Sequence, residues 1–442
     1  MTHDLAARVR AEIPRALEDL GRLVAIPSVS SMPEHAGDVD ASAALTCELL
    51  RAEGVDARVV HAGAARPAVL GRKEGPVGAP TVLLYAHHDV QPVGDLAHWT
   101  SDPFALTSRD DRLFGRGSSD DKGAIALHLA LLRAFGDELP VTLVFLVEGE
   151  EEIGSPEFAA VLSEHVDELR ADVVLVPDAV NPGTGTPSLT TDLRGNVDLV
   201  VELSTLTRPI HSGLYGGVLP CALTSLVQLL ATMHDDGGEL AVKGLLASEA
   251  PAPHVLLELE GLALDGVEPA PADQAARRLI SEPSITVLAV DAVPVAAASN
   301  VLHPTARAKV GIRVPPDGDP ATVLATVEDH LRAHVRSGAH LTMVGGRAGH
   351  GFHVTHGRAS EAWARAAREA FREESVDLGA GGSIPFVSAL ASAFPAAEFL
   401  VTAVQDPGSA AHSFDESLHV DLFTRACVAH ALLLRDLAGT ST

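Results

Sequence analysis

The segment Thr81–Ala86 is a continuous apolar run that ends abruptly in His87, His88 and Asp89. Such a run is typical of a parallel strand that is buried on both faces. Open α/β sheets place their functional sites beyond the carboxyl ends of these strands. His87 and Asp89 point to the same side of an extended chain, so His87 could bind a metal while Asp89 orients a neighbouring group. A simple turn is the alternative, unless other strands end in the same way.

Two further apolar segments do end in the same kind of residue. Val141–Val147 runs into the acidic stretch Glu148-Gly-Glu-Glu-Glu152, and Asp172–Pro177 is followed by Asp178. Carboxylates this close repel one another unless positive charge lies among them, although a solvated acidic turn would also accommodate them. Because three predicted strands each end in His, Asp or Glu, we expect the three ends to share one site.

A glycine- and serine-rich stretch, Leu113–Gly123, precedes a predicted helix over Ala124–Phe135. It matches neither of the common phosphate-binding patterns, Gly-x-x-x-x-Gly-Lys-Ser/Thr and Gly-x-Gly-x-x-Gly. Asp120 and Asp121 at the start of this helix can be N-caps. Alternatively, one of these carboxylates bridges two metal ions.

The length of 442 residues exceeds the ~250–300 residues of a single hydrophobic core, so two domains are expected. The 32 basic and 59 acidic side chains give a net charge of −27, which argues against nucleic acid or an anionic membrane as a partner. The first residues lack the apolar core of a signal peptide, and no apolar run approaches the ~20 residues of a membrane span. We therefore expect a cytoplasmic protein.

The cysteines Cys47, Cys221 and Cys427 are odd in number, far apart in the chain, and form no Cys-x-x-Cys motif. We expect neither a disulfide framework nor a sulfur-ligated metal. Burial as small apolar residues is the best interpretation of all three.

The order of predicted elements changes after residue 195. The next elements follow the order β-α-β-β-α-β, which is ferredoxin-like; they are a strand at 196–203, a helix at 220–233, strands at 284–290 and 306–314, a helix at 321–335 and a strand at 340–345. The sequence therefore predicts an α/β domain with a mixed, largely parallel sheet, formed by residues 1–195 and 353–442 and interrupted by a small α+β domain over 196–352. Residues 245–283 give no clear pattern.

Six side chains in this pattern suit divalent metals: His87, Asp120, Glu151, Glu152, Asp178 and His412. Nitrogen and oxygen ligands without thiolate fit zinc, and also cobalt or manganese. Five ligands, one of them bridging, are enough for two tetrahedral sites that share a water, and the sixth group would be a base. Such paired ions lie ~3.5–4 Å apart. His350, His353 and His356 are interpreted as a solvated interdomain segment, with a substrate contact or a further metal as the alternative.

Seven motifs, in order along nearly the whole chain, resemble the aminoacylase/carboxypeptidase family of di-zinc metallopeptidases, most closely its carnosinase-like dipeptidase branch. They are Ala86-His-His-Asp-Val-Gln-Pro92, Gly115–Gly123, Glu148–Ser155, Pro177-Asp178, His211–Gly217, Gly381-Gly-Ser-Ile-Pro385 and Ala411-His-Ser413. By this resemblance His87 and Asp178 hold one metal, Glu152 and His412 hold the other, and Asp120 bridges them. Glu151 is then the general base, and Asp89 orients His87. Two divalent ions per subunit are implied, with Zn²⁺ as the first choice and Mn²⁺ or Co²⁺ as alternatives.

The resemblance also implies that the inserted domain is a dimerisation lid. His211 would stabilise an oxyanion in the partner subunit's site, and Asn300 and Arg313 would contact substrate. Gly382 and Ser383 would receive the substrate carboxylate. The branch commonly has Arg-Glu just before Gly381, where this chain has Gly379-Ala380. Because an arginine is a bidentate donor to carboxylates, its loss argues against a strictly carnosine-like choice of substrate.

The resemblance implies a metal-dependent dipeptidase that acts on small peptides with a free carboxylate, in a homodimer. An N-acyl-amino-acid deacylase or a carboxypeptidase on the same scaffold is the alternative. A catalytically silent binding protein is more remote, because such a protein would be free to lose its metal ligands and Glu151.

Overall fold

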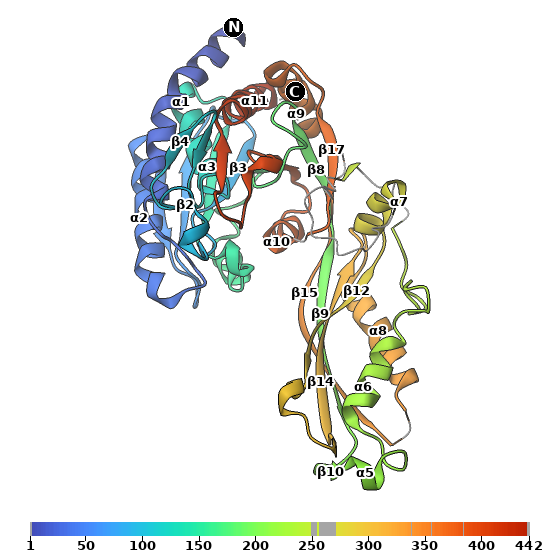
Figure 1. Cartoon of the computed structure of the whole chain (residues 1–442). Helices are drawn as coiled ribbons and strands as arrows, with labels where there is room; N and C mark the ends of the chain where they lie inside the picture. The colour runs from blue at the N-terminus through green and yellow to red at the C-terminus, as the bar shows by residue number, and fades with distance from the viewer. Residues whose placement is uncertain are drawn as a thin grey trace. The chain divides into compact units, whose positions relative to one another are not determined.

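A computed structural model describes residues 2–248, 254–255, 271–336, 338–354, 356–382 and 384–439 (Figure 1). The chain divides into two compact units. The first comprises Met1–Thr191, Val354–Leu378 and Pro385–Thr442, and the second comprises Asp192–His353 and Gly379–Ile384. The short segment Gly379–Ile384 thus groups with the second unit, whereas the boundaries drawn from the sequence put it with residues 353–442.

The first unit is built on a mixed sheet. Its strands run in the order β1 (Asp56–Val60), β2 (Ala68–Lys73), β6 (Thr142–Glu148), β3 (Thr81–His87), β7 (Val173–Val176), β18 (Glu398–Val401), β8 (Ser188–Leu193) and β17 (Val376–Ala380). The central strands β6, β3, β7 and β18 pair parallel, while β2 pairs antiparallel with both β1 and β6, and β18 pairs antiparallel with β8. The predicted α/β class and mixed sheet are confirmed.

Long helices form a common core with this sheet. They are α1 (Thr2–Val24), α2 (Ala36–Ala52), α3 (Lys122–Phe135), α9 (Arg358–Phe371) and α11 (Val420–Ala438). Leu5, Val9 and Leu20 recur at helical spacing and are buried, which explains why α1 packs against α3 and α11. Helix α2, which contacts β1 and β2, was not predicted.

Shorter elements complete the first unit. Helices α4 (Phe158–His165) and α10 (Pro385–Ala393) contact each other, and β19 (Ser417–His419), β5 (Arg112–Phe114) and β4 (Thr107–Arg109) form a small antiparallel sheet. This small sheet joins the segment before α3 to the segment after residue 412.

The second unit contains an antiparallel sheet in the order β12-β14-β9-β15, covered on one face by two helices (Figure 1). Along the chain its elements are β9 (Gly195–Ser204), α6 (Ala222–Ala231), β12 (Ser284–Asp291), β14 (Thr305–Val314), α8 (Pro320–His334) and β15 (His340–Gly349). Alternate residues of β9 and β14 are buried in the core with both helices. This is the predicted β-α-β-β-α-β order. Smaller elements are β10 (Ile210–His211), α5 (Ser212–Tyr215), β11 (His254–Val255), α7 (Ala272–Ala276), β13 (Val301–Leu302) and β16 (Phe352–His353).

All three cysteines are free thiols. Cys47 and Cys427 are buried as expected. The expectation is wrong for Cys221, which is only partly buried because it occupies the N-cap of α6, at the end of the helix rather than on its packed face. Within the described ranges, no helix combines the length and apolar character needed to cross a membrane.

Candidate metal centre

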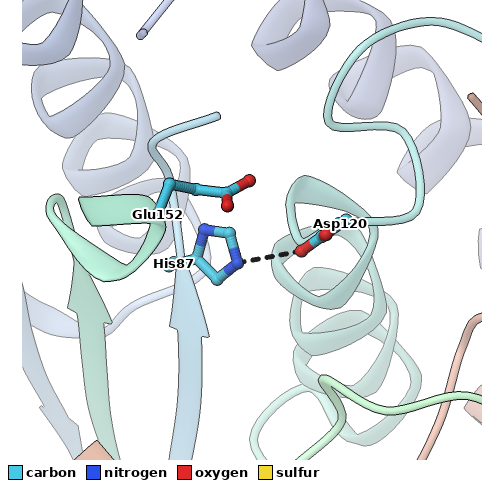
Figure 2. Close-up of side chains that lie close together, drawn as sticks. All are labelled: His87, Asp120 and Glu152. Carbon is cyan, nitrogen blue, oxygen red and sulfur yellow. Dashed lines mark hydrogen bonds and ion pairs between the residues drawn. The ribbon is translucent and has the colours of Figure 1, made fainter. Parts of the chain in front are cut away.

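Side chains from separate segments of the first unit converge beyond the carboxyl end of β3. His87 ends β3, Asp120 precedes α3, and Glu152 lies in the turn after β6, as Figure 2 shows. His87 Nε2 lies 3.1 Å from Asp120 Oδ1, and His412 Nε2 lies 3.0 Å from Asp120 Oδ2. His412 Nε2 is also 3.1 Å from Glu152 Oε2. The two oxygens of Asp120 therefore face two different histidines.

Two groups of side chains have ligand atoms close enough to hold an ion. They are His87, Asp120 and Glu152, and His87, Asp121 and Asp178; within each group the atoms lie within 4.8 Å of one another. His87 Nε2 is 3.9 Å from Asp178 Oδ2. These donors are imidazole nitrogens and carboxylate oxygens, which suit Zn²⁺, Mn²⁺ or Co²⁺. The structure thus brings all five predicted metal ligands together, while the metal each would hold stays a prediction.

The electrostatics of this cluster favour a cation. Burial raises the pKa of the Asp178 carboxyl, and nearby Asp121 and Asp120 raise it further. Hydrogen bonds to Asp120 and Glu152 raise the pKa of His412 to about 10. A raised carboxyl pKa beside a raised histidine pKa is the pattern expected where buried negative charges crowd together, and a cation relieves that repulsion. The donor set therefore fits divalent ions in charge as well as in atom type.

Glu151 lies beside these groups, and among the described residues its carboxylate accepts no hydrogen bond. Burial raises its pKa to about 7, which suits a general base. Glu150 differs, because its carboxylate accepts hydrogen bonds from the backbone N–H groups of Arg66 and Glu157 at 3.2 and 2.7 Å. Of the two neighbours, Glu151 is the one free to exchange a proton.

Asp89 connects His87 to the acidic turn. His87 Nδ1 lies 3.0 Å from the backbone oxygen of Asp89 and 3.4 Å from its carboxylate. The Asp89 carboxylate accepts hydrogen bonds from the backbone N–H groups of Glu151 and Glu152 at 3.2 and 3.1 Å. This one buried carboxylate therefore orients His87 and fixes the turn that carries two predicted site residues.

Asp121 belongs to the cluster, although the sequence-based assignment gave the bridging role to its neighbour Asp120. It occupies the N-cap position of α3, yet its side chain makes no capping hydrogen bond. Instead its Oδ2 accepts from the backbone N–H of His87 at 3.2 Å, and its buried Oδ1 has no hydrogen-bond partner among the described residues. Asp121 therefore occupies the predicted N-cap position without capping the helix through its side chain, because its carboxylate belongs to the cluster of candidate ligands.

Glu416 is a second residue that the sequence did not reveal. Its fully buried carboxylate accepts from Arg116 Nη1 at 2.6 Å and from the backbone N–H groups of Gly117, Ser119 and Asp120 at 3.0–3.1 Å. The Ser119 hydroxyl donates a fifth hydrogen bond, at 3.1 Å. Arg116 Nη2 also donates to the backbone oxygen of Ser413 at 3.0 Å. This network joins the loop of Asp120 to the loop of His412.

The loop that carries His412 has an unusual backbone. His412 has φ +61°, in the left-handed region that non-glycine residues rarely adopt. Asp415 in the same loop has φ +54°, and its carboxylate accepts from the backbone N–H of Thr100 at 2.9 Å. A conformation of this kind costs about 1–3 kcal/mol and persists where the surroundings fix it, which happens most often at functional sites.

The remaining predicted site residues lie in the second unit. Strand β10, which ends at His211, pairs with β13, and the Ser212 N–H donates to the backbone oxygen of Asn300 at 2.9 Å. His211 and Asn300 are therefore neighbours. Arg313 lies on β14, and Gly382 lies in the short segment that groups with this unit, while Ser383 is outside the described residues.

The three histidines near the unit boundary are not part of the described ligand groups. His353 Nδ1 is 2.8 Å from an oxygen of Asp192, and His356 Nε2 is 3.0 Å from an oxygen of Asp377. His88, the neighbour of His87, is buried, and its Nε2 lies 2.8 Å from the backbone oxygen of Pro67. Burial lowers the pKa of His88 to about 4, so it is a neutral core histidine.

Comparison with known proteins agrees with this geometry. The model of peptidase family M20/M25/M40 matches residues 83–436. The cysteinylglycine-S-conjugate dipeptidase of Corynebacterium striatum is 34% identical over 434 residues, covering 95% of each chain. The beta-Ala-His dipeptidase of Rattus norvegicus is 30% identical over 239 residues, or 51% of this chain and 49% of that protein.

A solved structure of the dipeptidase Dug1p from Saccharomyces cerevisiae shares the fold. It matches with a TM-score of 0.78 at 24% identity and covers 100% of this chain and 99% of that one. These matches confirm the resemblance drawn from the motifs and the predicted class of enzyme, a metallopeptidase. The protein belongs to peptidase family M20/M25/M40.

Proposed function

We propose that the protein is a metal-dependent dipeptidase that hydrolyses the amide bond of a dipeptide with a free carboxylate. The observation that carries this proposal is the position of Asp120, whose two oxygens face His87 and His412 at 3.1 and 3.0 Å. A carboxylate shared in this way is the natural bridge between two ions. The relative named for cysteinylglycine S-conjugates favours dipeptides as the substrate class.

In this proposal His87 and Asp178 hold one ion, Glu152 and His412 hold the other, and Asp120 bridges them. Zn²⁺ is the first choice, with Mn²⁺ or Co²⁺ as alternatives, because the donors are nitrogen and oxygen. When bound, such a pair of ions supplies Lewis-acid stabilisation and lowers the pKa of water.

The residues of the chain supply the proton transfers. Glu151, with its pKa raised to about 7 by burial, accepts a proton from the attacking water and returns it to the leaving amine. Asp89 holds the backbone of Glu151 in place through the hydrogen bond at 3.2 Å, and this fixes the direction of transfer. Neither step requires Glu150, whose carboxylate is engaged elsewhere.

His211 is proposed to donate a hydrogen bond to the oxyanion of the reaction in the partner subunit. Its Nδ1 accepts from the Gly213 N–H at 3.0 Å, so the neutral ring carries its proton on Nε2. The exposed imidazole can therefore act as a donor. Asn300, beside it, is proposed to contact substrate, as are Arg313, Gly382 and Ser383.

The proposal includes a homodimer. It forms through residues 196–352, the inserted lid that separates the catalytic segments 1–195 and 353–442 in the sequence. Strand β12 is at the edge of its sheet, and it exposes Val287, Leu288 and Val290. An exposed apolar edge strand is a ready template for pairing with another chain. A second copy of the same edge would cover it.

The closest competing functions are an N-acyl-amino-acid deacylase and a carboxypeptidase on the same scaffold. The cytoplasmic location stays a prediction from the sequence. To separate the activities, protein loaded with Zn²⁺, Mn²⁺ or Co²⁺ is incubated with a mixed library of dipeptides, longer peptides and N-acyl amino acids, and products are followed by mass spectrometry. Release from dipeptides above the other two classes is expected, and it should cease after chelation. Dominant release of acyl groups, or activity without metal, would contradict the proposal.

A further inference from the structure

Gln91 contacts the candidate metal ligand Glu152 at three of its atoms. The backbone N–H of Gln91 donates to Glu152 Oε1 at 3.1 Å. Its side-chain amide donates to Glu152 Oε2 at 2.8 Å and to the Glu152 backbone oxygen at 3.1 Å. A backbone oxygen can only accept, so the amide presents its nitrogen on this side. One residue therefore binds both carboxylate oxygens of a candidate ligand.

The segment after β3 holds the backbone of Glu152 from both sides. The Asp89 carboxylate accepts from the Glu152 N–H at 3.1 Å, and the Gln91 amide donates to the Glu152 backbone oxygen. The segment is itself anchored, because the backbone oxygen of Pro92 accepts from Arg116 Nη2 at 3.3 Å. The Glu152 side chain is only 3% exposed. Its carboxylate is therefore held in one orientation, and Gln91 supplies the contacts to that carboxylate.

The orientation of the carboxylate turns one oxygen, Glu152 Oε2, toward His412. The distance from this oxygen to His412 Nε2 is 3.1 Å. Two atoms that bind one zinc ion at ~2.0–2.2 Å with a tetrahedral angle are ~3.3 Å apart, so Oε2 has the spacing of a ligand atom. A carboxylate oxygen has two lone pairs, and Oε2 can accept from Gln91 and still bind an ion. Oε1 is meanwhile occupied by the backbone N–H of Gln91.

The two candidate ions differ in how much they depend on this support. His412 has a side chain that is 57% exposed, so Glu152 is the firmly held ligand on its side of the centre. His87, on the other side, is fully buried, and its Nδ1 lies 3.0 Å from the backbone oxygen of Asp89. Among the described residues, the side chain of Gln91 forms hydrogen bonds with Glu152 alone.

We propose that Gln91 is a positioning residue that sets the affinity of the ion held by Glu152 and His412, and not that of the ion held by His87 and Asp178. The proposal rests on the proposed pair of ions and adds the residue that controls one of them. Partners that orient a metal ligand typically change metal affinity by about 10–100-fold when they are replaced. Because Gln91 acts through Glu152, its loss should be compensated by a higher concentration of metal.

The test measures metal binding directly. Metal-free protein is titrated with Zn²⁺ in competition with a chromophoric chelator, which gives a dissociation constant for each ion, and metal analysis counts the ions bound. Gln91→Met keeps the length of the side chain and the backbone N–H but removes the amide donor. It should weaken one ion by about 10–100-fold and the other by less than about threefold. Gln228→Met is the matched control, because Gln228 is an exposed glutamine on α6, and both constants should stay unchanged.

A second variant assigns the weakened ion. In a His412→Ala background the ion of that side is already lost, so adding Gln91→Met should change the affinity of the remaining ion by less than about threefold. Thermal unfolding of the metal-free proteins checks that each variant folds. If Gln91→Met does not fold, Gln91→Ala, which removes the same amide donor, is measured instead. In the single Gln91→Met variant, kcat should return to the wild-type value when Zn²⁺ saturates both sites.

Each outcome bears on one proposal. Unchanged affinities in Gln91→Met, or equal weakening of both ions, would overturn the role of Gln91. A further loss of affinity in the His412→Ala background would overturn it too, since the effect would then lie on the wrong ion. A kcat that stays low at saturating Zn²⁺ would also overturn it. Wild-type protein that binds fewer than two ions would instead contradict the proposed function.

Discussion

Replacement of Glu416 by glutamine tests whether this residue holds the candidate metal centre together. The carboxylate accepts five hydrogen bonds, three on Oε1 and two on Oε2. Glutamine has nearly the same shape, but its amide nitrogen cannot accept a hydrogen bond, so the donors on one side lose their acceptor. Arg116 also loses its anionic partner. Breaking a buried ion pair in this way costs about 3–5 kcal/mol. At about 2 °C per kcal/mol, the melting temperature of the first unit should fall by at least about 6 °C.

The assay is thermal unfolding followed by circular dichroism, with chelator present so that metal loss does not contribute. Glu168→Gln is the matched control, because Glu168 also pairs with an arginine, Arg58, at 2.7 Å but both side chains are about half exposed. An exposed pair contributes about 0–1 kcal/mol, so this variant should melt within about 2 °C of the wild type. Equal shifts in the two variants would refute the reasoning that the buried network dominates.

Three further predictions concern the mechanism, the assembly and the effect of pH. Glu151→Gln should lower turnover by about 10²–10⁴-fold while both metals stay bound, measured by steady-state kinetics and metal analysis; loss of a metal would make Glu151 a ligand instead. His211→Ala should lower turnover by about 10²–10³-fold. Mixing it with Glu151→Gln subunits should restore about half of one normal dimer's activity, and an inactive mixture after proven subunit exchange would exclude action across subunits. Burial lowers the pKa of His430 to about 4, below the ordinary value of about 6.5. As the pH falls, this histidine therefore takes up a proton in the unfolded chain before it does so in the folded protein. Stability should therefore fall as pH drops from about 6.5 to 4, by about 3 kcal/mol for this residue, and His430→Gln should flatten a urea-unfolding pH profile. The exposed His61→Gln should leave the profile unchanged.

The central strands were predictable because each is a continuous apolar run. Strands β3, β6 and β7 begin and end within a residue or so of the sequence-based ranges. Helix α2 was missed although Val39, Ala43 and Leu50 are buried at helical spacing. Strand β8 was missed for a different reason. It reads Ser-Leu-Thr-Thr-Asp-Leu, which has no apolar run, although all six residues are buried within the sheet between β18 and β17.

The residues of the candidate site likewise fall into those that the sequence predicted and those that it did not. His87, Glu152 and Asp178 were identified because each lies at the end of a recognisable strand or within four residues of it. Glu416 gave no such signal, because its partners lie 296–300 residues away in the chain. Pairings of this kind depend on tertiary contacts, so they cannot be predicted from the spacing of residues along the chain.

The separation between the predicted metal ligands along the chain has a consequence for synthesis in the cell. Four of the five are encoded before residue 179, but His412 and the supporting Glu416 follow the whole second unit. At ~5–20 residues per second, a ribosome needs roughly 10–50 s to pass from one group to the other. Helix α11, which packs against α1 and α3, emerges later still. A nascent chain therefore lacks the complete set of predicted ligands until His412 has been added.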